Sequence, residues 1–382
     1  MAITRIGNIA STIPDDSIQN AKFSNIVQSK NIIINGDMSI AQRATSASSL
    51  TSSGYHTVDR YQTSITNIGT WTQSQSTTVP TGQGFATSLK MDCTTADASP
   101  AADDALLIKQ KIEGQNLQYL KKGTSSAESL TLSFWVRSNK TGTYITRLQD
   151  ADNSRNISQS YTISSADTWE KKTLTFAGDT TGAFNNDNGS SLELNFWLGA
   201  GSTYTSGTLN TSWNSITDAN IAVGQVNLSD STSNEWYITG VQLEAGTTAS
   251  DFEFLPFDVN FERCKRYFTI PVRSRGSDTP IANGTMYNAT DFYGIFEVGK
   301  GMRASPTLSA PTGTNFYGLV GNAASDLFTG SDMSFGNITN DGTCKARIEV
   351  TSVSGKSQGQ GAWVRFEAAS SSSDFISASA EL

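Results

Sequence analysis

The chain has a single histidine, His56, so a hydrolytic site built on an imidazole would have to use it. His56 stands in the run Gly-Tyr-His-Thr-Val-Asp-Arg-Tyr, and no nucleophile-elbow pattern accompanies it. Asp59 follows three residues later, but that spacing does not define a catalytic triad, which is recognised by its geometry. We therefore interpret His56 as a surface or turn residue.

Paired carboxylates are the other common hydrolytic device, and glycosidases hold two of them about 5 to 9.5 Å apart. Candidates occur at Asp103, Asp104, Glu193 and Glu244, but the sequence does not pair them. No phosphate-binding loop, dinucleotide fingerprint or zinc-protease motif occurs. These observations predict a protein that is not an enzyme and has no catalytic residues.

Aromatic, amide and guanidinium side chains in this chain suit the binding of sugars. A sugar can place its apolar C–H face on a Trp or Tyr ring, while amides and guanidinium groups bind its hydroxyls. Trp135 and Arg137 share one face of a predicted strand, and Asn195 and Trp197 share one face of another. If the two strands are neighbours, these four side chains form a glycan-binding strip.

Aromatic residues in polar loops are further glycan-binding candidates, namely Tyr204, Trp213 and Trp71. The alternative is that the tryptophans pack in the core, against the other sheet or against a neighbouring subunit, because Trp is highly buried on average. A receptor site could equally lie in the C-terminal part, where the candidate aromatic residues are Tyr287, Phe292, Tyr293, Phe316 and Tyr317.

Strict alternation of apolar and polar residues predicts the strands that would position these side chains. The apolar sets are Leu130, Leu132, Phe134 and Val136 in one run and Leu192, Leu194, Phe196 and Leu198 in another. Alternate side chains of a strand point to opposite faces, so each set is expected in a core. Such strands between Gly-, Ser-, Asn- and Asp-rich loops predict a jelly roll or β-sandwich over residues 31–258. Residues 109–122 alone suggest a short helical turn.

Composition limits the class of protein. The 382 residues are 37% hydrophobic and 16% charged, and Gly, Ser, Thr and Asn are frequent, as in β-proteins with many turns. The net charge is −8 and the basic residues are scattered, so nucleic-acid binding is not expected. No secretory signal is expected, and no apolar run approaches the roughly 20 residues of a membrane-spanning helix, so membrane insertion is not expected.

The three cysteines, Cys93, Cys264 and Cys344, show neither zinc-site spacing nor a disulfide framework. This usage fits a protein that folds in a reducing cytosol.

The chain divides into three parts. Residues 1–30 carry six spaced isoleucines among polar residues, which predicts an arm that docks on another protein or intertwines with sister chains. A flexible terminus is the alternative. After the 31–258 domain, residues 259–382 begin with a helical turn at 261–268 and continue with strands at 292–298, 346–353 and 362–367. The sequence thus predicts an all-β protein with an extended arm, a jelly roll and a smaller C-terminal β-sandwich.

Three segments resemble parts of one protein family. They are Asn-Gly-Asp-Met-Ser-Ile-Ala-Gln-Arg at 35–43, Gln-Leu-Glu-Ala-Gly at 242–246 followed by Arg-Cys-Lys-Arg-Tyr-Phe at 263–268, and Met-Arg-Ala-Ser-Pro-Thr at 302–307. They resemble the NGDMxxxQR opening, the QLEAG–RCxRYF junction and the MRxxPT segment of bacteriophage tail-fibre and receptor-binding proteins with a carbohydrate-binding-module-like β-sandwich.

The resemblance implies a structural virion protein, a tail fibre that adheres to host surface polysaccharide. It implies a homotrimer made in the host cytoplasm, with the arm on a tail or adaptor protein and residues 259–382 as the distal tip. It also implies structural roles for Asp59 and Arg60. Three alternatives remain: a head fibre or capsid decoration protein, a glycan-degrading tailspike, and a stand-alone bacterial carbohydrate-binding protein.

The resemblance also makes a structural calcium ion a candidate, and no other cofactor is expected. Asp37 and Glu244 could supply oxygen ligands if the first and last strands of the jelly roll pair. The alternative is an Asx turn at Asp37 and a solvated Glu244.

The segment between the two β units yields two further predictions. Tyr237, Val241 and Leu243 fall on one face of the last strand by alternation and are expected to be buried together. Phe252, Phe254 and Phe257 are expected to fix the angle between the two units.

Overall fold

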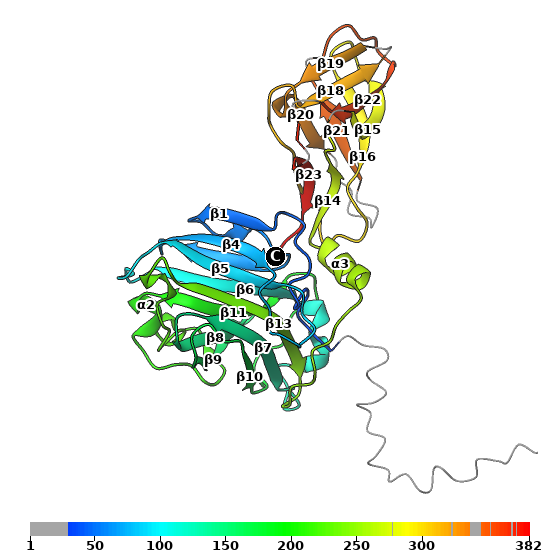
Figure 1. Ribbon diagram of the computed structural model, residues 1–382. Helices are drawn as coiled ribbons and strands as arrows, with labels where there is room; N and C mark the ends of the chain where they lie inside the picture. Colours follow the sequence, from blue (N-terminus) through cyan, green and yellow to red (C-terminus); the bar gives the residue numbers. More distant parts are fainter. Residues whose placement is uncertain are drawn as a thin grey trace, which may run out of the picture.

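A computed structural model describes residues 30–276, 278–321, 324–336, 345–351, 353–367, 370–371 and 373–382. The predicted N-terminal arm, apart from Lys30, and Cys344 lie outside these residues. The described chain folds almost entirely into antiparallel sheets, as the alternation predicts, and forms two units that we call the body and the tip (Figure 1).

The body is a sandwich of two sheets. The six-stranded body sheet has the order β1 (Ser46–Leu50), β4 (Thr70–Ser76), β5 (Ser88–Thr95), β13 (Glu235–Ala245), β7 (Leu130–Ser138) and β10 (Glu170–Phe176). The seven-stranded body sheet has the order β12 (Asn214–Ser215), β9 (Arg155–Ile163), β8 (Gly142–Asp150), β11 (Ser190–Ala200), β6 (Ala105–Glu113), β3 (Gln62–Thr66) and β2 (Gly54–Tyr55).

The alternation in β7 and β11 places the predicted apolar sets in one core between the two sheets, and this prediction is confirmed. The rings of Phe134 and Phe196 meet edge to face across the sandwich with centroids 5.2 Å apart. Trp236 of β13 packs on Phe196 from the same side. Each such side chain removes a large apolar surface from water, so truncation of either phenylalanine to Ala is expected to cost about 3–5 kcal/mol of stability.

Short helical segments connect the strands of the body. They are α2 (Ser202–Thr205) and the 3-10 turns Gly114–Asn116, Gln118–Leu120, Asp218–Asn220 and Leu228–Asp230. The helical turn expected within residues 109–122 thus exists, but only after β6 ends at Glu113.

A β-bulge in β13 overturns the prediction for the last strand. The register with β7 shifts between Thr239 and Gln242, and Gly240 adopts a left-handed φ of 63°. Trp236 and Ile238 therefore face the core before the bulge, and Val241 and Leu243 face it after the bulge. Tyr237 lies on the opposite, outward face, because one extra residue reverses the alternation.

The tip follows α3 (Phe257–Lys265), which confirms the helical turn expected before a strand. Its three-stranded sheet has the order β14 (Phe268–Arg273), β23 (Phe375–Ser379) and β17 (Thr307–Ser309). Its seven-stranded sheet has the order β19 (Ala324–Phe328), β18 (Tyr317–Gly321), β22 (Gly361–Phe366), β15 (Thr279–Met286), β16 (Phe292–Glu297), β21 (Lys345–Val350) and β20 (Met333–Gly336). A 3-10 turn, Gly330–Asp332, precedes β20, and both sheets contribute to one hydrophobic core.

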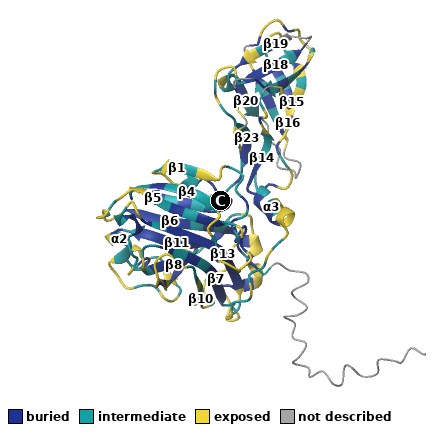
Figure 2. Cartoon of the chain, in the orientation of Figure 1, coloured by how far each residue is buried: buried dark blue, intermediate teal, exposed yellow. Residues whose placement is uncertain are grey.

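Arg60 joins the body to the tip. Its guanidinium is buried, pairs with Glu381 near the C-terminus and donates to the carbonyl oxygen of Lys111 at 2.6 Å. It also lies 3.4 Å from the centroid of the Tyr267 ring, which follows α3. A small buried cluster of Ile34, Ile40, Cys264 and Tyr267 also joins the two units. Figures 1 and 2 show α3 between the body and the sheets of the tip.

The linker phenylalanines do not set the angle between body and tip, so that prediction is wrong. Phe252 and Phe254 pack on Phe85 of the body, with ring centroids 5.1 Å from it in both cases. Phe257 is 64% exposed and stacks only on Phe261 within α3. Phe252 and Phe254 thus fasten the linker to the body, while Arg60 and its partners form the junction.

Among the residues that the structure describes, no helix is long and apolar enough to span a membrane.

Candidate functional site

The four residues of the predicted strip lie on two different sheets. β7 pairs with β10 and β13, whereas β11 pairs with β6 and β8. Trp135 and Arg137 therefore lie on the outer face of the six-stranded body sheet, and Asn195 and Trp197 lie on the outer face of the seven-stranded one. A single strip of all four is not formed, because the sandwich core separates the two faces.

Arg137 is engaged in contacts within the protein. Its guanidinium lies 4.9 Å from the centroid of the Tyr237 ring and donates to Asp167 at 2.8 Å and Glu235 at 3.2 Å. The neighbouring Trp135 is half-buried, opposite Lys171 and Thr239 in the sheet. These contacts leave few donors of Arg137 for a ligand.

Trp197 is only 3% exposed, because the segment that carries α2 covers it. Its ring packs on Tyr204 with centroids 5.3 Å apart and contacts Leu107 and Ile145. Trp197 and Tyr204 thus belong to a small apolar cluster on the outer face of this sheet, beside α2.

The other two candidate tryptophans lie elsewhere. Trp213 stands before the edge strand β12, donates to the carbonyl oxygen of Ala177 at 2.7 Å and packs against the body core. Trp71 is fully buried and donates to the carbonyl oxygen of Ile68 at 2.7 Å.

In the C-terminal part, two of the candidate aromatic residues, Phe292 and Tyr317, are buried in the tip core. Tyr287 and Tyr293 form an outward stacked pair with ring centroids 4.7 Å apart.

A row of polar side chains crosses the outer face of the seven-stranded body sheet around Asn195. Directly paired positions in adjacent antiparallel strands point to the same face. One residue from each of five neighbouring strands, β2, β3, β6, β11 and β8, is paired with the next across the sheet. These residues form the polar row, which consists of Tyr55, Gln62, Lys109, Asn195 and Arg147. Each strand contributes the residue that its alternation turns away from the core.

Several atoms of the polar row are buried and make no hydrogen bond within the described part of the chain. They are both amide atoms of Asn195, the amide oxygen of Gln62 and the Nε of Arg147. Asn195 is 0% exposed and Arg147 is 8% exposed. Burial of such a group without a partner costs about 1–3 kcal/mol, and native proteins rarely leave it unpaired. These groups have hydrogen-bonding capacity that the protein does not use.

The polar row is also positively charged. Lys109 and Lys111 place their ammonium groups 3.9 Å from the carboxylate of Glu193, which is beyond hydrogen-bond distance. Burial lowers the pKa of Arg147 to about 10, although Glu193 opposes the shift. Burial also lowers the pKa of Lys109. Lys109 and Lys111 thus flank Glu193, and both Glu193 and Asp218 act on Arg147. Partial desolvation of these three cations favours an additional anion.

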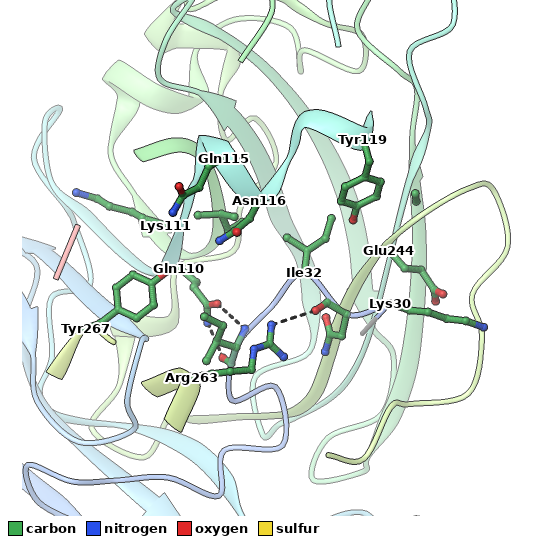
Figure 3. A pocket seen from close by; sticks show the side chains of 14 residues that line it. Lys30, Ile32, Gln110, Lys111, Gln115, Asn116, Tyr119, Glu244, Arg263 and Tyr267 are labelled. Carbon is green, nitrogen blue, oxygen red and sulfur yellow. Dashed lines mark hydrogen bonds between the residues drawn. The ribbon is translucent and has the colours of Figure 1, made fainter. Parts of the chain in front are cut away.

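A cavity of about 710 Å³ opens at the junction of body and tip (Figure 3). Tyr119, Glu244 and Arg263 line its rim, and its wall includes the first described residues, Lys30 and Ile32. Most of its polar side chains already bind the protein: Gln110 pairs with the backbone of Ile34, Gln115 with Glu113, and Arg263 with the carbonyl oxygen of Asn31. Buried side-chain atoms without a partner in the described part of the chain occur in the polar row and not in the lining of this cavity.

The two calcium candidates do not fit a metal site. Asp37 accepts hydrogen bonds from Ser39 and from the amide of Asn260, and Glu244 accepts them from Gln242 and Ser250. The two carboxylates share no hydrogen-bond partner, so they do not form one ligand set. No group of three or more His, Cys, Asp or Glu within the described residues could hold a metal ion.

The residues considered for catalysis have separate surroundings. Asp103 accepts from Thr203, Asp104 accepts from the backbone of Ala101, and Glu193 lies between two lysines. His56 is half-buried in a loop after β2, and burial lowers its pKa.

Sequence reasoning found Asn195 but missed its neighbours Tyr55, Gln62, Lys109 and Arg147. Lys109 alternates with the buried Ile108 and Gln110, so its outward direction could have been predicted. The order and register of five strands, which bring the row together, depend on contacts far apart in the sequence.

The body with its outward polar row belongs to the class of antiparallel β-sandwiches. No family model and no curated protein matches the chain. A solved structure that is similar is the enzymatically active domain of tailspike protein 4 of bacteriophage CBA120, at 17% identity, with a TM-score of 0.31 and coverage of 56% of this chain and 21% of that one. The chain thus spans about a fifth of that tailspike structure.

Carbohydrate-binding modules are also similar. A family 11 module from Clostridium thermocellum in complex with a mixed-linked tetrasaccharide has 10% identity and a TM-score of 0.26, and the match covers 54% of this chain and 99% of the module. The TmCBM61 module in complex with β-1,4-galactotriose has 8% identity and a TM-score of 0.29, over 57% of this chain and 99% of the module. Similarities this remote carry no argument about a ligand, so the function is argued from the residues of this chain.

Proposed function

We propose that the protein is a non-enzymatic glycan-binding protein and that the polar row on the seven-stranded body sheet is its binding site. The observation that carries the proposal is the Asn195 amide, which is buried in the middle of an outward sheet face with both polar atoms unpaired. A glycan hydroxyl can donate to the amide oxygen and accept from the amide nitrogen at the same time. Binding would thus supply the partners that the fold does not.

The charges of the site favour glycans that carry carboxylate or phosphate groups. Lys109, Lys111 and Arg147 outnumber the two carboxylates that act on them, those of Glu193 and Asp218, although the whole chain is acidic. The two lysine side chains are long and only partly buried, so they can move to admit a ligand beside Asn195. Affinity that depends on these cations should fall as salt rises.

The biological setting that we propose is a bacteriophage tail fibre. The motif segments at 35–43, 242–246, 263–268 and 302–307 support this setting by resemblance. The protein would be a homotrimer, made in the host cytoplasm and placed on the virion, with its first thirty residues bound to a tail or adaptor protein. Several weak contacts to host polysaccharide would then add through multivalency.

Paired charge variants on the two outer faces test the site. We expect the double variant K109Q/R147Q to lose at least about tenfold in affinity for host surface polysaccharide, measured by biolayer interferometry. The matched control is K171Q/R137Q, which removes the same charges from the outer face of the six-stranded sheet. The proposal fails if both variants bind as the wild type does, or if only the control loses binding.

Two alternatives have their own tests. A glycan-degrading tailspike is the first alternative. Incubation of host polysaccharide with the protein, followed by size-exclusion chromatography, would reveal shortened chains if the protein is an enzyme. Labelling of virions with an antibody would distinguish a tail fibre from a head fibre or decoration protein.

A further inference from the structure

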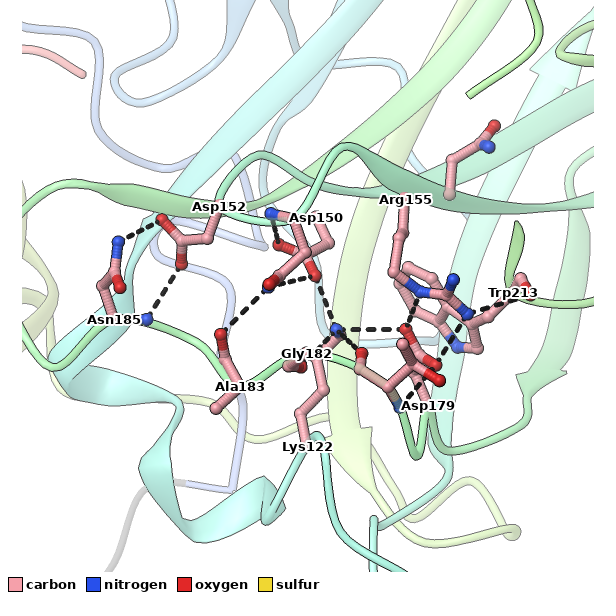
Figure 4. A network of polar contacts seen from close by, with 12 residues as sticks. Lys122, Asp150, Asp152, Arg155, Asp179, Gly182, Ala183, Asn185 and Trp213 are labelled. Carbon is pink, nitrogen blue, oxygen red and sulfur yellow. Dashed lines mark hydrogen bonds and ion pairs between the residues drawn. The ribbon is translucent and has the colours of Figure 1, made fainter. Parts of the chain in front are cut away.

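Lys122 is a buried lysine at one end of the body. It follows the 3-10 turn Gln118–Leu120, and its side chain is 4% exposed. The side chain enters a space between the loop after β8 and the loop after β10, where Asp150 and Asp179 are also buried (Figure 4). A buried ammonium needs compensation, because removing a charge from water is costly.

Four oxygen atoms surround the ammonium of Lys122. They are Oδ2 of Asp150 at 2.5 Å, Oδ2 of Asp179 at 3.0 Å, and the carbonyl oxygens of Thr181 at 2.9 Å and Gly182 at 2.8 Å. An ammonium has three hydrogens, so this oxygen cage offers more acceptors than Lys122 can satisfy with one bond each. Two carboxylates and two main-chain carbonyls are a ligand set that hard cations such as Ca²⁺ prefer.

Contacts that do not involve Lys122 hold the oxygen cage in place (Figure 4). Arg155 donates to both oxygens of Asp179 at 2.7 and 3.0 Å, and the backbone of Asn153 donates to Asp150 at 3.1 Å. Gly182 has a φ of 71°, and a Cβ atom there would approach Asn153 to 2.5 Å. The carbonyls are therefore directed at the centre of the cage by the loops themselves.

We propose that the oxygen cage is a calcium-type cation site in which the Lys122 ammonium takes the place of the metal ion. The tethered ammonium cannot dissociate, so this end of the body is held together at any concentration of divalent cations. When the ammonium is removed and space is left, the same four oxygens, completed by water, should bind Ca²⁺.

The two carboxylates and Arg155 leave a net charge of −1 in the site once Lys122 is removed. This low charge favours weak affinity, with a dissociation constant on the order of 10⁻⁴ to 10⁻³ M. Mg²⁺ should bind less well, because it demands near-ideal octahedral geometry and keeps its water shell.

The test compares Lys122→Ala, Lys122→Met and Lys121→Ala in the full chain. Lys122→Ala opens the cage, whereas Lys122→Met fills it with an uncharged side chain of similar length. Lys121→Ala is the surface control, since Lys121 is exposed and pairs with Glu128. The thermal unfolding midpoint of each is measured in EDTA, in about 10 mM CaCl₂ and in about 10 mM MgCl₂, concentrations chosen to exceed the expected dissociation constant.

We expect calcium to raise the midpoint of Lys122→Ala by several degrees, with little effect of magnesium and none on the wild type, Lys122→Met or Lys121→Ala. If Lys122→Ala does not fold in EDTA, the yield of refolding in calcium against EDTA replaces the midpoint. The proposal is overturned if calcium acts equally on all four proteins, or if neither the midpoint nor the refolding yield of Lys122→Ala responds to it. The second result would leave Lys122 as an ordinary buried ion-pair partner.

Discussion

At the scale of single residues, Arg60 and Asp59 form a junction between the body and the tip. The sequence indicated only that the two residues have structural roles, and did so through the family resemblance. Arg60 is buried between the body and the tip, and adjacent Asp59 accepts hydrogen bonds from the backbone and side chain of Gln42. Gln42 in turn donates to the carbonyl oxygen of Phe268 in the tip at 2.8 Å. These two neighbours therefore connect sequence segments more than two hundred residues apart.

Removal of the Arg60 charge should destabilise the protein strongly. We expect Arg60→Met to lower the free energy of unfolding by about 3–5 kcal/mol, because it leaves Glu381 buried without its closest cation. Urea denaturation measures the change. Arg43→Met is the matched control, since Arg43 pairs with the same Glu381 at 3.3 Å but is more exposed, and its loss should cost clearly less. Equal losses in the two variants would contradict this role for Arg60.

Asp59 should make stability depend on pH in a defined window. Burial raises its pKa to about 6, partly offset by hydrogen bonds from Gln42, whereas its value in the unfolded chain is about 3.9. Between these values the folded protein holds a proton that the unfolded chain has released, so stability should fall as pH rises from about 4 to 6. The expected loss is about 3 kcal/mol.

Asp59→Asn should flatten this part of the stability profile, measured by urea denaturation at several pH values. Asp251→Asn, at an exposed carboxylate, is the control and should keep the slope. Asp179 acts at more acidic pH. Burial alone would raise the pKa of Asp179, but Arg155 and Lys122 lower it below its usual value. The stability that Asp179 contributes is therefore lost as pH falls below about 4. A profile of Asp59→Asn that matches the wild type would contradict the assignment.

At the scale of elements, the core-facing residues of a strand were predictable, whereas the register between strands was not. The alternation in β7 and β11 gave the buried set of each strand correctly, because a half-buried strand must separate apolar from polar residues. The bulge at Gly240 could not be predicted, since it depends on how β13 pairs with β7. The same limit applies to the candidate site, because Asn195 acquires its neighbours only through the pairing of five strands.

The bulge should depend on the glycine at position 240. A Cβ atom there would approach the Phe85 ring to 2.6 Å, and the left-handed backbone disfavours other residues. We expect Gly240→Ala to destabilise the protein by about 2–4 kcal/mol through strain and overpacking. Gly82→Ala is the control, because Gly82 has a similar φ of 77° but nothing within 4 Å of its Cβ position.

The difference between the two alanine variants in chemical denaturation isolates the contact with Phe85. Gly82→Ala should lose only the backbone term, about 1 kcal/mol. If the two variants lost the same stability, close packing at the bulge would not be the reason for the glycine.

At the scale of the whole molecule, the residues that carry the family resemblance have structural contacts. Asn35 caps its own turn by bonding Ile40 and Asp59, and a Cβ atom at Gly36 would collide with the carbonyl oxygen of Val241. Arg303 of the tip donates to the carbonyl oxygen of Asn188 in the body at 3.2 Å. Asn35 and Gly36 thus order the first turn of the body, and Arg303 joins the tip to the body. The motif residues therefore indicate an architecture and do not identify the ligand.

The proposed tail-fibre role predicts a homotrimer in solution. Multi-angle light scattering of the full chain should give three times the 40.9 kDa chain mass. A mass of one chain at micromolar concentration would contradict the trimer, while the glycan-binding site within each chain would remain to be tested separately.

The most direct test of the central claim is a binding isotherm of host surface polysaccharide on wild-type protein and on Asn195→Ala. Asn195 is the buried, unpaired centre of the polar row, and loss of a hydrogen bond to a ligand should cost about 1–3 kcal/mol, or roughly 5- to 150-fold in affinity. Thermal stability should not fall in this variant, since the amide has no partner in the described part of the protein to lose and its unpaired burial is itself unfavourable. Unchanged affinity in Asn195→Ala would contradict the assignment of this face as the glycan-binding site.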